Sequence, residues 1–354
     1  MCAQKRNFKS RDLALTDSLK RTRELAMRIA KANKITRAQS GMNKYYRFYD
    51  GSKNNFEHYV SGDKVLILRQ YGGFGDAIIL SCLLNEINKR YDCPIVYGCR
   101  ETYMEFYNNV PFVSCIPFDL VHFGGTVTKE CKIASKVTNL YDIIIDLTVP
   151  CHIWEELFFD PLVNKWRNRL DMWGNWCGLY DFESPSTCIK LMPEEINHAN
   201  SYYIKRTSKP VAVVSLTSAN IHKDFTAEAP MLINGLTDMG YQVLHVGDPS
   251  KLSKIKTVHA KTKREFLAIM AAAEIVVSVD SAALHAASVF GTRTYGLFST
   301  NDGKAYCKYY PNTTPIQLCE KKCIWRYCTD TKAPCYPKGS ARKILDVING
   351  SSVC

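Results

Sequence analysis

The chain has 354 residues, of which 46% are hydrophobic, and a formal net charge of +12. A single core rarely extends over so many residues, so we expect two domains. No apolar stretch approaches the roughly 18 residues needed to span a bilayer, and the polar start does not resemble a signal peptide. Fifteen cysteines without an export signal favour a reducing compartment, so we expect a cytoplasmic protein rather than a secreted or membrane-spanning one.

The positive charge is concentrated in residues 1–63, which hold 14 Lys and Arg against 6 Asp and Glu and thus +8 of the total. Residues 11–34 show a helical spacing of apolar side chains with basic side chains on the other faces, and aromatic residues follow at 45–49. A basic amphipathic helix of this kind is typical of segments that contact a membrane surface or a nucleic acid. The alternative is a solvated helix packed on the next domain.

The first strand signal is the apolar run at residues 65–68, and a helical pattern extends from residue 77 to about 91. Between them lies a loop with three glycines and one carboxylate: Gly72, Gly73, Gly75 and Asp76. Glycines let the backbone approach a ligand closely. The loop is not a dinucleotide fingerprint, because Ile78 stands where the third glycine belongs, so a nicotinamide enzyme is not favoured. Asp76 is therefore predicted either as a functional carboxylate or as a simple helix cap.

Strands and helices alternate along most of the remaining chain, which predicts an α/β protein with two doubly wound parallel sheets facing across a cleft. The expected domains are a basic helical extension (1–63), an N-terminal Rossmann-like domain (64–190) and a C-terminal Rossmann-like domain (191–354). Tryptophan-rich helical segments interrupt the pattern between 150 and 200, and residues 184–186 read as a linker. The expected strands lie at 65–69, 94–98, 113–116, 143–147, 211–216, 242–246, near 257, 275–279 and 294–298.

The loop after the predicted strand at 211–216 contains Thr217, Ser218 and Lys223. Hydroxyls just past a strand end donate hydrogen bonds to phosphate oxygens, and an ammonium group neutralises their charge. The loop is thus a candidate phosphate site, although a plain solvent-exposed loop is the alternative.

A second candidate anion site follows the strand at 275–279, which ends in Asp280 and turns at once into a small-residue helix beginning at Ala282. The first N–H groups of such a helix have no partners within it and lie at the positive end of its dipole. Asp280, Ser281, Ala282 and His285 are therefore predicted to bind a phosphate or nucleotide. The alternative is a plain strand–helix unit in which Asp280 caps the helix and His285 is packed.

A cysteine group near the C-terminus comprises Cys319, Cys323, Cys328 and Cys335. Four thiolates can hold a structural zinc ion. The spacing contains no Cys-x2-Cys pair, however, so unligated thiols are the favoured interpretation.

From about residue 64 to 348 the chain resembles the ADP-heptose:lipopolysaccharide heptosyltransferase family, glycosyltransferase family nine. The resemblance rests on the glycine loop with Asp76, on Thr217-Ser218 with Lys223-Asp224-Phe225, on Asp280 through His285, and on residues 296–302. The Asp-Ser-Ala-Ala-Leu-His motif is the most specific of these, and Ala282 stands where the family usually has glycine. The resemblance implies the two-domain GT-B fold and an inverting transfer from a nucleotide-diphosphate sugar, an ADP-sugar in the family.

By this resemblance Asp76 is the general base, and Thr217, Ser218, Lys223, Asp280, Ser281, Ala282 and His285 bind the donor. A helix N-terminus and a lysine can stabilise the departing diphosphate, and the chain has no Asp-x-Asp motif, so we expect neither metal nor cofactor. The implied acceptor is lipopolysaccharide core or another glycan, with peripheral contact at the inner membrane face. The alternatives are a bacteriophage-type transferase acting on hydroxylated DNA bases, with residues 1–63 on the DNA, and a binding module of the same fold without activity.

Overall fold

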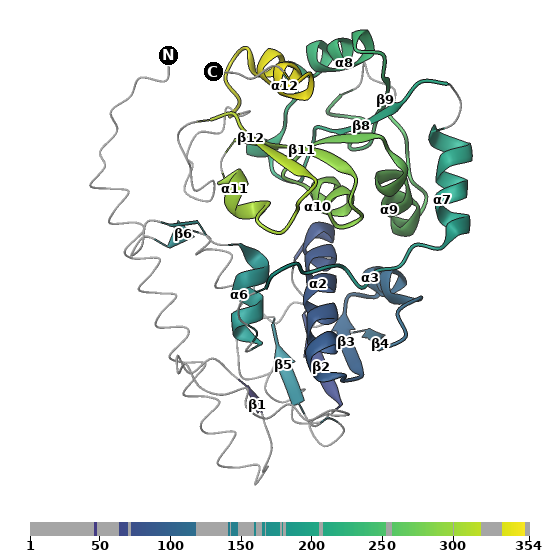
Figure 1. Ribbon diagram of the computed structural model, residues 1–354, viewed down its shortest axis with the longest axis vertical. Coiled ribbons are helices and arrows are strands. Elements are labelled where there is room, and N and C mark those ends of the chain that lie inside the picture. The colour runs from purple at the N-terminus through teal and green to yellow at the C-terminus, as the bar shows by residue number, and fades with distance from the viewer. Residues whose placement is uncertain are drawn as a thin grey trace.

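The computed structural model describes most of the chain after residue 63 (Figure 1). Its description covers residues 46–47, 64–69, 72–117, 141, 143–147, 159–160, 165–166, 168–177, 179, 182–204, 208–252, 257–299, 301–319 and 335–350. The predicted basic helix at 11–34 lies outside these ranges. Of residues 1–63 the structure describes Tyr46–Arg47, a short strand that joins the first sheet.

The first half is built on a five-stranded parallel sheet in the order β1-β5-β2-β3-β4. The strands are short apolar runs, and all four residues of β2 are buried, as expected for a parallel sheet covered by helices. Its strands are β1 (Tyr46–Arg47), β2 (Val65–Leu68), β3 (Ile95–Cys99), β4 (Val113–Pro117) and β5 (Ile143–Asp146). The helices are α2 (Phe74–Tyr91), α3 (Glu101–Met104), a 3-10 turn (Glu105–Tyr107) and α6 (Arg169–Trp176), and a small antiparallel pair is formed by β6 (Phe159–Asp160) and β7 (Lys165–Trp166).

The second half repeats this plan with a parallel sheet in the order β12-β11-β10-β8-β9. The strands are β8 (Val211–Ser215), β9 (Gln242–His245), β10 (Ile275–Val279), β11 (Arg293–Phe298) and β12 (Thr313–Gln317). The helical elements are α7 (Pro193–Ala199), a π-helical turn (Asn200–Ile204), a 3-10 turn (Ile221–Lys223), α8 (Ala229–Asp238), α9 (Lys263–Ala272), α10 (Ala282–Val289), α11 (Gly303–Tyr306) and α12 (Ser340–Ile348). The predicted α/β class with two parallel sheets is confirmed.

Three details differ from the sequence prediction. Helix α2 begins at Phe74 rather than at residue 77, so Gly75 and Asp76 lie in its first turn. The position near Thr257 forms a single bridge with His245 and not a strand. Strand β12 was not predicted, because Pro315 and the polar residues around Ile316 leave no apolar run at this sheet edge.

In each sheet the chain reverses its direction of winding at one point, between β2 and β5 in the first and between β8 and β10 in the second. In open α/β sheets, ligands bind beyond the carboxyl ends of the strands at such switch points. Asp76 in the first turn of α2 follows β2, Lys223 in a 3-10 turn follows β8, and Asp280 follows β10 directly. The topology therefore gathers the sequence-predicted residues at the two expected crevices.

The two halves are in direct contact where α2 meets α10 (Figure 1). A Cβ atom on Gly75 would lie 2.8 Å from Cδ2 of His285 and 3.3 Å from Cα of Ala282, so only glycine permits this approach. At the other side of α2, Phe74 packs on Phe266 of α9, with ring centroids 5.0 Å apart. One buried apolar cluster includes side chains of both halves. Among the described residues, no helix combines the length and apolar character needed to cross a membrane.

Candidate active site

Asp76 occupies the third position of α2 and is buried, with 7% of its surface exposed. Its Oδ2 accepts a hydrogen bond from the backbone N–H of Gly73 at 2.7 Å, which satisfies a free donor at the helix start. Oδ2 also lies 3.7 Å from Nη2 of Arg69. Oδ1 forms an ion pair and hydrogen bond with Nη1 of Arg169, from α6. Asp76 is thus both a helix cap and the centre of a charged cluster.

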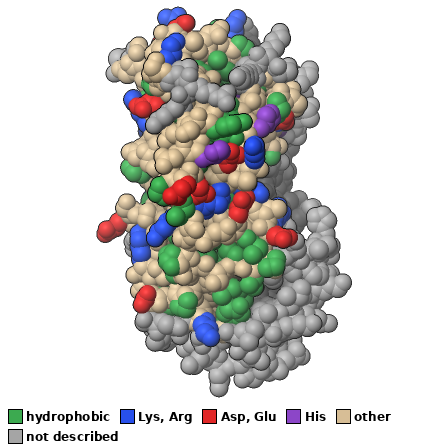
Figure 2. Space-filling model, turned by 90° about the vertical axis from the view of Figure 1, so that its right-hand side faces the viewer, with side chains coloured by type: hydrophobic (Ala, Val, Ile, Leu, Met, Phe, Trp, Pro, Cys, Tyr) green, Lys and Arg blue, Asp and Glu red, His purple; other side chains and the backbone are tan. Residues whose placement is uncertain are grey.

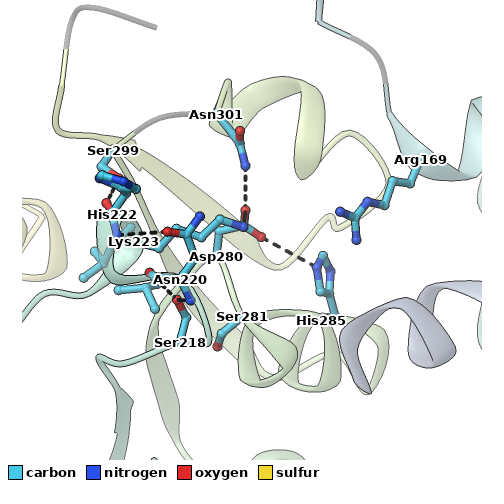
Figure 3. Close-up of polar contacts among 12 residues, drawn as sticks. Arg169, Ser218, Asn220, His222, Lys223, Asp280, Ser281, His285, Ser299 and Asn301 are labelled. Carbon is cyan, nitrogen blue, oxygen red and sulfur yellow. Dashed lines mark hydrogen bonds and ion pairs between the residues drawn. The ribbon is translucent and has the colours of Figure 1, made fainter. Parts of the chain in front are cut away.

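The two arginines are held differently. Arg69 follows β2 directly, is 3% exposed, and its guanidinium stacks 4.2 Å from the ring centroid of Trp173. A cation stacked on an indole in a buried site is a fixed element of the structure. Arg169, in contrast, starts α6 and points toward the second half of the protein (Figure 3).

The second-half site is centred on Asp280, at the end of β10 (Figure 3). Oδ2 of Asp280 accepts hydrogen bonds from Nζ of Lys223 at 2.6 Å and from Nδ2 of Asn301 at 2.7 Å. Oδ1 lies 3.9 Å from Nε2 of His285. The carboxylate therefore binds Lys223 and Asn301 and lies close to His285, three side chains from separate segments that meet at the start of α10. On one face of the molecule, Figure 2 shows Lys, Arg, Asp, Glu and His side chains gathered across the middle, where the two halves meet.

The protonation states in this cluster follow from burial and charge. Burial alone would raise the pKa of Asp280, but the Lys223 ammonium and His285 outweigh it and lower the pKa to about 2. Burial lowers the pKa of His285 to about 4, although Asp280 acts in the opposite direction. At neutral pH Asp280 is therefore ionised and His285 is neutral.

Tyr310 determines which nitrogen of His285 carries the proton. Its hydroxyl lies 2.9 Å from Nδ1 of His285, and burial raises the pKa of Tyr310 well above its usual value. We therefore assign Tyr310 as the donor to Nδ1, which leaves the proton of His285 on Nε2, facing the carboxylate of Asp280. His285 is then a neutral N–H donor at the centre of the site.

Ser281 is the N-cap of α10, and its Oγ accepts a hydrogen bond from the backbone N–H of Ala283 at 3.3 Å. The cap is therefore Ser281 and not Asp280, the capping residue of the alternative interpretation. Ala282 keeps the backbone N–H that a glycine would have offered there. It also forms the surface on which Gly75 packs.

The loop after β8 is held by hydrogen bonds within it and by hydrogen bonds to the segment after β9. The hydroxyl of Thr217 accepts the backbone N–H of Asp248 at 3.2 Å, and Ser218 exchanges hydrogen bonds with the backbone of Asn220 at 2.8 and 3.0 Å. Asp224 accepts the N–H of Ser218 at 2.6 Å and an ammonium hydrogen bond from Lys251 at 2.7 Å. In this structure the two predicted hydroxyls shape the loop, while its lysine, Lys223, reaches the Asp280 cluster.

The three glycines of the predicted loop have separate roles. Gly72 has a φ of +113°, in the region that favours glycine. Gly73 donates its N–H to Asp76, and a Cβ there would meet only Oδ2 of Asp76, at 3.9 Å. Gly75 makes the close contact with α10.

A cavity of about 480 Å³ lies between the start of α2, the end of β9 and the start of α9, and its lining includes neither Asp76 nor the residues around Asp280. The aromatic rings of Phe74 and Phe266 form part of its wall, and basic side chains lie near its edge. It is lined by Phe74, Glu105, Val246, Gly247, Val258, His259, Ala260, Lys261, Thr262, Lys263 and Phe266. Ligand pockets are commonly lined by apolar and aromatic side chains with a few polar groups, and this lining fits that description.

Sequence reasoning missed Arg169, Asn301, Lys251 and Tyr310. Asn301 lies in residues 296–302, which carried part of the family resemblance. This motif was recognised from the sequence, but the contact of Asn301 with Asp280 was not predicted. Arg169 is outside every strand-end loop, and no local pattern marks it. Its place in the site depends on how α6 packs.

Of the predicted cysteine group, Cys319 and Cys335 are among the described residues, whereas Cys323 and Cys328 lie outside them. Sγ of Cys335 is 3.6 Å from Nδ1 of His222. Within the described ranges, no three His, Cys, Asp or Glu side chains are grouped so that they would hold a metal ion.

Comparisons with known proteins establish the fold. No family model and no curated protein sequence matches this chain. Among solved structures, it is similar to a glycosyl transferase family 9 protein from Veillonella parvula, with 15% identity, a TM-score of 0.58, and coverage of 73% of this chain and 87% of that one.

Two Escherichia coli structures are also similar. ADP-heptose lps heptosyltransferase II has 15% identity and a TM-score of 0.56 over 81% of this chain and 98% of its own. Heptosyltransferase WaaC with ADP has 13% identity and a TM-score of 0.54 over 82% and 100%. The chain therefore has the two-domain GT-B fold of these glycosyltransferases, as the sequence resemblance implied.

Proposed function

We propose that this protein is an inverting, metal-independent glycosyltransferase that moves a sugar, heptose-like by resemblance, from an ADP-sugar to a hydroxyl acceptor. The observation that carries the proposal is the position of Asp76. Its carboxylate pairs with Arg169, which lines one small cavity together with His285 of the Lys223–Asp280–His285 cluster, so a candidate base and a candidate diphosphate site adjoin. ADP and ADP-heptose occur in the names of the similar structures.

In the proposed reaction the acceptor oxygen attacks the anomeric carbon while Asp76 takes the hydroxyl proton. The bond between that carbon and the phosphate oxygen breaks, and its electron pair leaves with the nucleoside diphosphate. Attack on the face opposite the leaving group inverts the anomeric configuration. The product is the glycosylated acceptor, and the proton remains on Asp76 until solvent removes it.

The leaving diphosphate is stabilised by groups gathered at the start of α10. The N–H groups at the start of α10 point along the helix dipole, Lys223 contributes a cation, and His285 contributes a neutral N–H. We place the nucleobase in the cavity walled by Phe74 and Phe266, next to the backbone of residues 258–261.

For the acceptor we propose a carbohydrate, either lipopolysaccharide core or another glycan, because the fold is that of heptosyltransferases. Residues 1–63 would then contact the anionic inner face of the membrane, and the protein would act in the cytoplasm. The charge of residues 1–63 supports the second candidate, sugar transfer to hydroxylated bases in DNA.

The direct test is a panel of nucleotide sugars and nucleoside diphosphates, scored by thermal protection and by slow hydrolysis of the donor. We expect ADP and an ADP-sugar to raise the melting temperature more than their UDP and GDP counterparts, in the presence of EDTA. Absence of protection by every nucleotide would remove the basis for a donor site.

A further inference from the structure

Both oxygens of Asp76 are engaged, although the proposed reaction requires this carboxylate to accept a proton. Oδ2 holds the N–H of Gly73 and lies near Arg69, and Oδ1 holds Arg169. Nearby guanidinium charges and a hydrogen bond from Arg169 favour the ionised form of a carboxylate and therefore oppose the uptake of a proton. In this arrangement the guanidinium of Arg169 lies against Oδ1, the oxygen of Asp76 that does not hold the N–H of Gly73.

We propose that Arg169 is a donor-operated switch, which holds Asp76 while the site is empty and transfers to the diphosphate when the donor binds. This inference rests on the proposed function. It adds an order of events: Asp76 becomes available as a base only after the nucleotide sugar is in place. The acceptor hydroxyl is then activated only when an anomeric carbon is present for it to attack.

The position of Arg169 fits such an exchange. Its charge contributes to lowering the pKa of both Asp280 and His285, so the guanidinium is already close to the proposed diphosphate site. It lines a small cavity together with His285 and Tyr310. The fork of a guanidinium binds phosphate oxygens in pairs, and a diphosphate carries more negative charge than one carboxylate.

Helix α6 holds the backbone of Arg169 in a fixed position. Nδ2 of Asn168 donates hydrogen bonds to the backbone oxygens of Ala305 and Tyr306 at 2.9 and 3.1 Å, which ties the start of α6 to the second half. Trp173 of the same helix is buried in the apolar cluster shared by both halves. Arg169 can therefore exchange partners by side-chain rotation, without movement of the helix.

Arg69 is the contrasting case on the same carboxylate. Its side chain is 2% exposed and stacked on Trp173, whereas that of Arg169 is 18% exposed. Arg69 stays beside Asp76 after Arg169 leaves, together with the N–H of Gly73. These contacts keep the carboxylate oriented while Oδ1 becomes free.

The test is a double-mutant cycle on ADP affinity, measured by calorimetry in EDTA with the full-length chain. Asp76→Asn should tighten ADP binding by about tenfold, because a neutral amide holds a guanidinium much more weakly than a carboxylate does. Arg169→Gln should weaken ADP binding by about tenfold or more, because it removes a charge-assisted contact. In the Arg169→Gln background, Asp76→Asn should change the Kd by less than about twofold.

Arg342→Gln, an identical substitution at an exposed position on α12, is the matched control and should leave the Kd unchanged. Arg169→Lys keeps the charge, so Asp76→Asn should still tighten ADP binding in that background. This result would show that the loss of coupling in Arg169→Gln comes from the missing charge and not from a folding defect. Equal tightening by Asp76→Asn with and without Arg169 would mean simple charge repulsion and would overturn the switch. So would an unchanged Kd in the single Asp76→Asn variant.

The two proposals fail in different ways. If the unaltered protein binds no nucleotide, the donor site itself is wrong and the switch is lost with it. If ADP binds and Lys223→Ala weakens it, but the cycle shows no coupling between Asp76 and Arg169, the donor site stands and the switch is refuted.

Discussion

Asp76 performs two tasks at the residue scale, since its carboxylate caps α2 and faces Arg169. Asp76→Asn preserves the size of the side chain and an acceptor oxygen for the N–H of Gly73, but the amide cannot take up the acceptor proton. We expect kcat to fall by about 10² or more, although ADP binding tightens because Arg169 is released. Normal turnover by the variant, measured with the donor found in the nucleotide-sugar panel, would exclude Asp76 as the base.

Lys223 forms the closest ion pair of the Lys223–Asp280–His285 cluster, with Nζ 2.6 Å from Oδ2 of Asp280. Lys223→Ala should weaken ADP binding by about tenfold or more, because the diphosphate loses a buried cation. EDTA should leave transfer unchanged, since the lysine and the start of α10 stabilise the leaving group. Activity lost in EDTA and restored by magnesium or manganese would contradict this role.

The lowered pKa values of His285 and Asp280 predict how the stability of the protein depends on pH. The folded protein keeps His285 neutral down to a pKa of about 4, so the unfolded chain takes up this proton first as the pH falls below the ordinary value of 6.5. Stability is therefore lost between pH 6.5 and 4. The lowered pKa of Asp280 acts in the same direction at lower pH, because its stabilisation is lost as the pH falls from 3.8 to about 2.

Urea unfolding at pH 7 and pH 4.5 measures this effect. From a shift of this size, His285 accounts for up to about 3 kcal/mol of the acid destabilisation. His285→Gln should be less stable at pH 7 but should lose less stability on acidification. His245, whose pKa is also lowered by burial, contributes to the remaining slope in both proteins. An identical slope in the variant would contradict the neutral, buried state of His285.

At the scale of elements, the decisive contact is between α2 and α10. Glycine is a poor helix former, so Gly75→Ala would favour α2 as an isolated helix. In the protein, however, the new Cβ would lie 2.8 Å from Cδ2 of His285, a ring that also contacts Tyr310. We expect a loss of about 1–3 kcal/mol of stability, as for other overpacked contacts, and a weaker ADP site.

Gly73→Ala is the matched control for this contact. Gly73 has a φ of −83°, which any residue adopts, and open space around its Cβ position apart from Oδ2 of Asp76 at 3.9 Å. The control should change the melting temperature little, whereas Gly75→Ala should lower it. Equal effects of the two substitutions would mean that backbone freedom, and not the approach of α10, determines the need for glycine at residue 75.

At the scale of the whole molecule, most of the net positive charge lies in residues 1–63 and little of it in the rest of the chain. Residues 1–63 carry +8, whereas the other 291 residues hold 32 Lys and Arg against 28 Asp and Glu. We expect the full-length protein to co-sediment with anionic vesicles, with binding that weakens as salt rises. A chain lacking residues 1–40, which retains β1 on the first sheet, should lose vesicle binding and still glycosylate a soluble sugar acceptor.

The same pair of proteins tests the DNA candidate. A duplex shifted in a gel by the full-length chain, with a shift that fades between about 50 and 200 mM salt and disappears on truncation, would favour transfer to DNA. Insolubility of the truncated chain would instead identify the apolar face of residues 11–34 as part of the core.

The amino-acid sequence by itself determined the α/β class, the parallel strands and the loops after β2, β8 and β10. These features depend on short-range signals: apolar runs of strand length, helical periodicity and the polar residues where a strand gives way to a helix. Asp280 and His285 were found in this way because strand, turn and helix start lie within a few residues. The start of α2 was misjudged, since the local preference of glycine against helices was overridden by the Asp76 cap and the packing on α10.

Only the tertiary structure decided what surrounds these loops. Arg169 reaches Asp76 across 93 positions of the chain, and Asn301 reaches Asp280 across 21, so neither contact leaves a local pattern. The cavity beside Phe74 is likewise formed by segments that meet only when the halves pack together. The neutral state of His285 arises from burial, a property of the assembled site and not of the residue's neighbours in sequence.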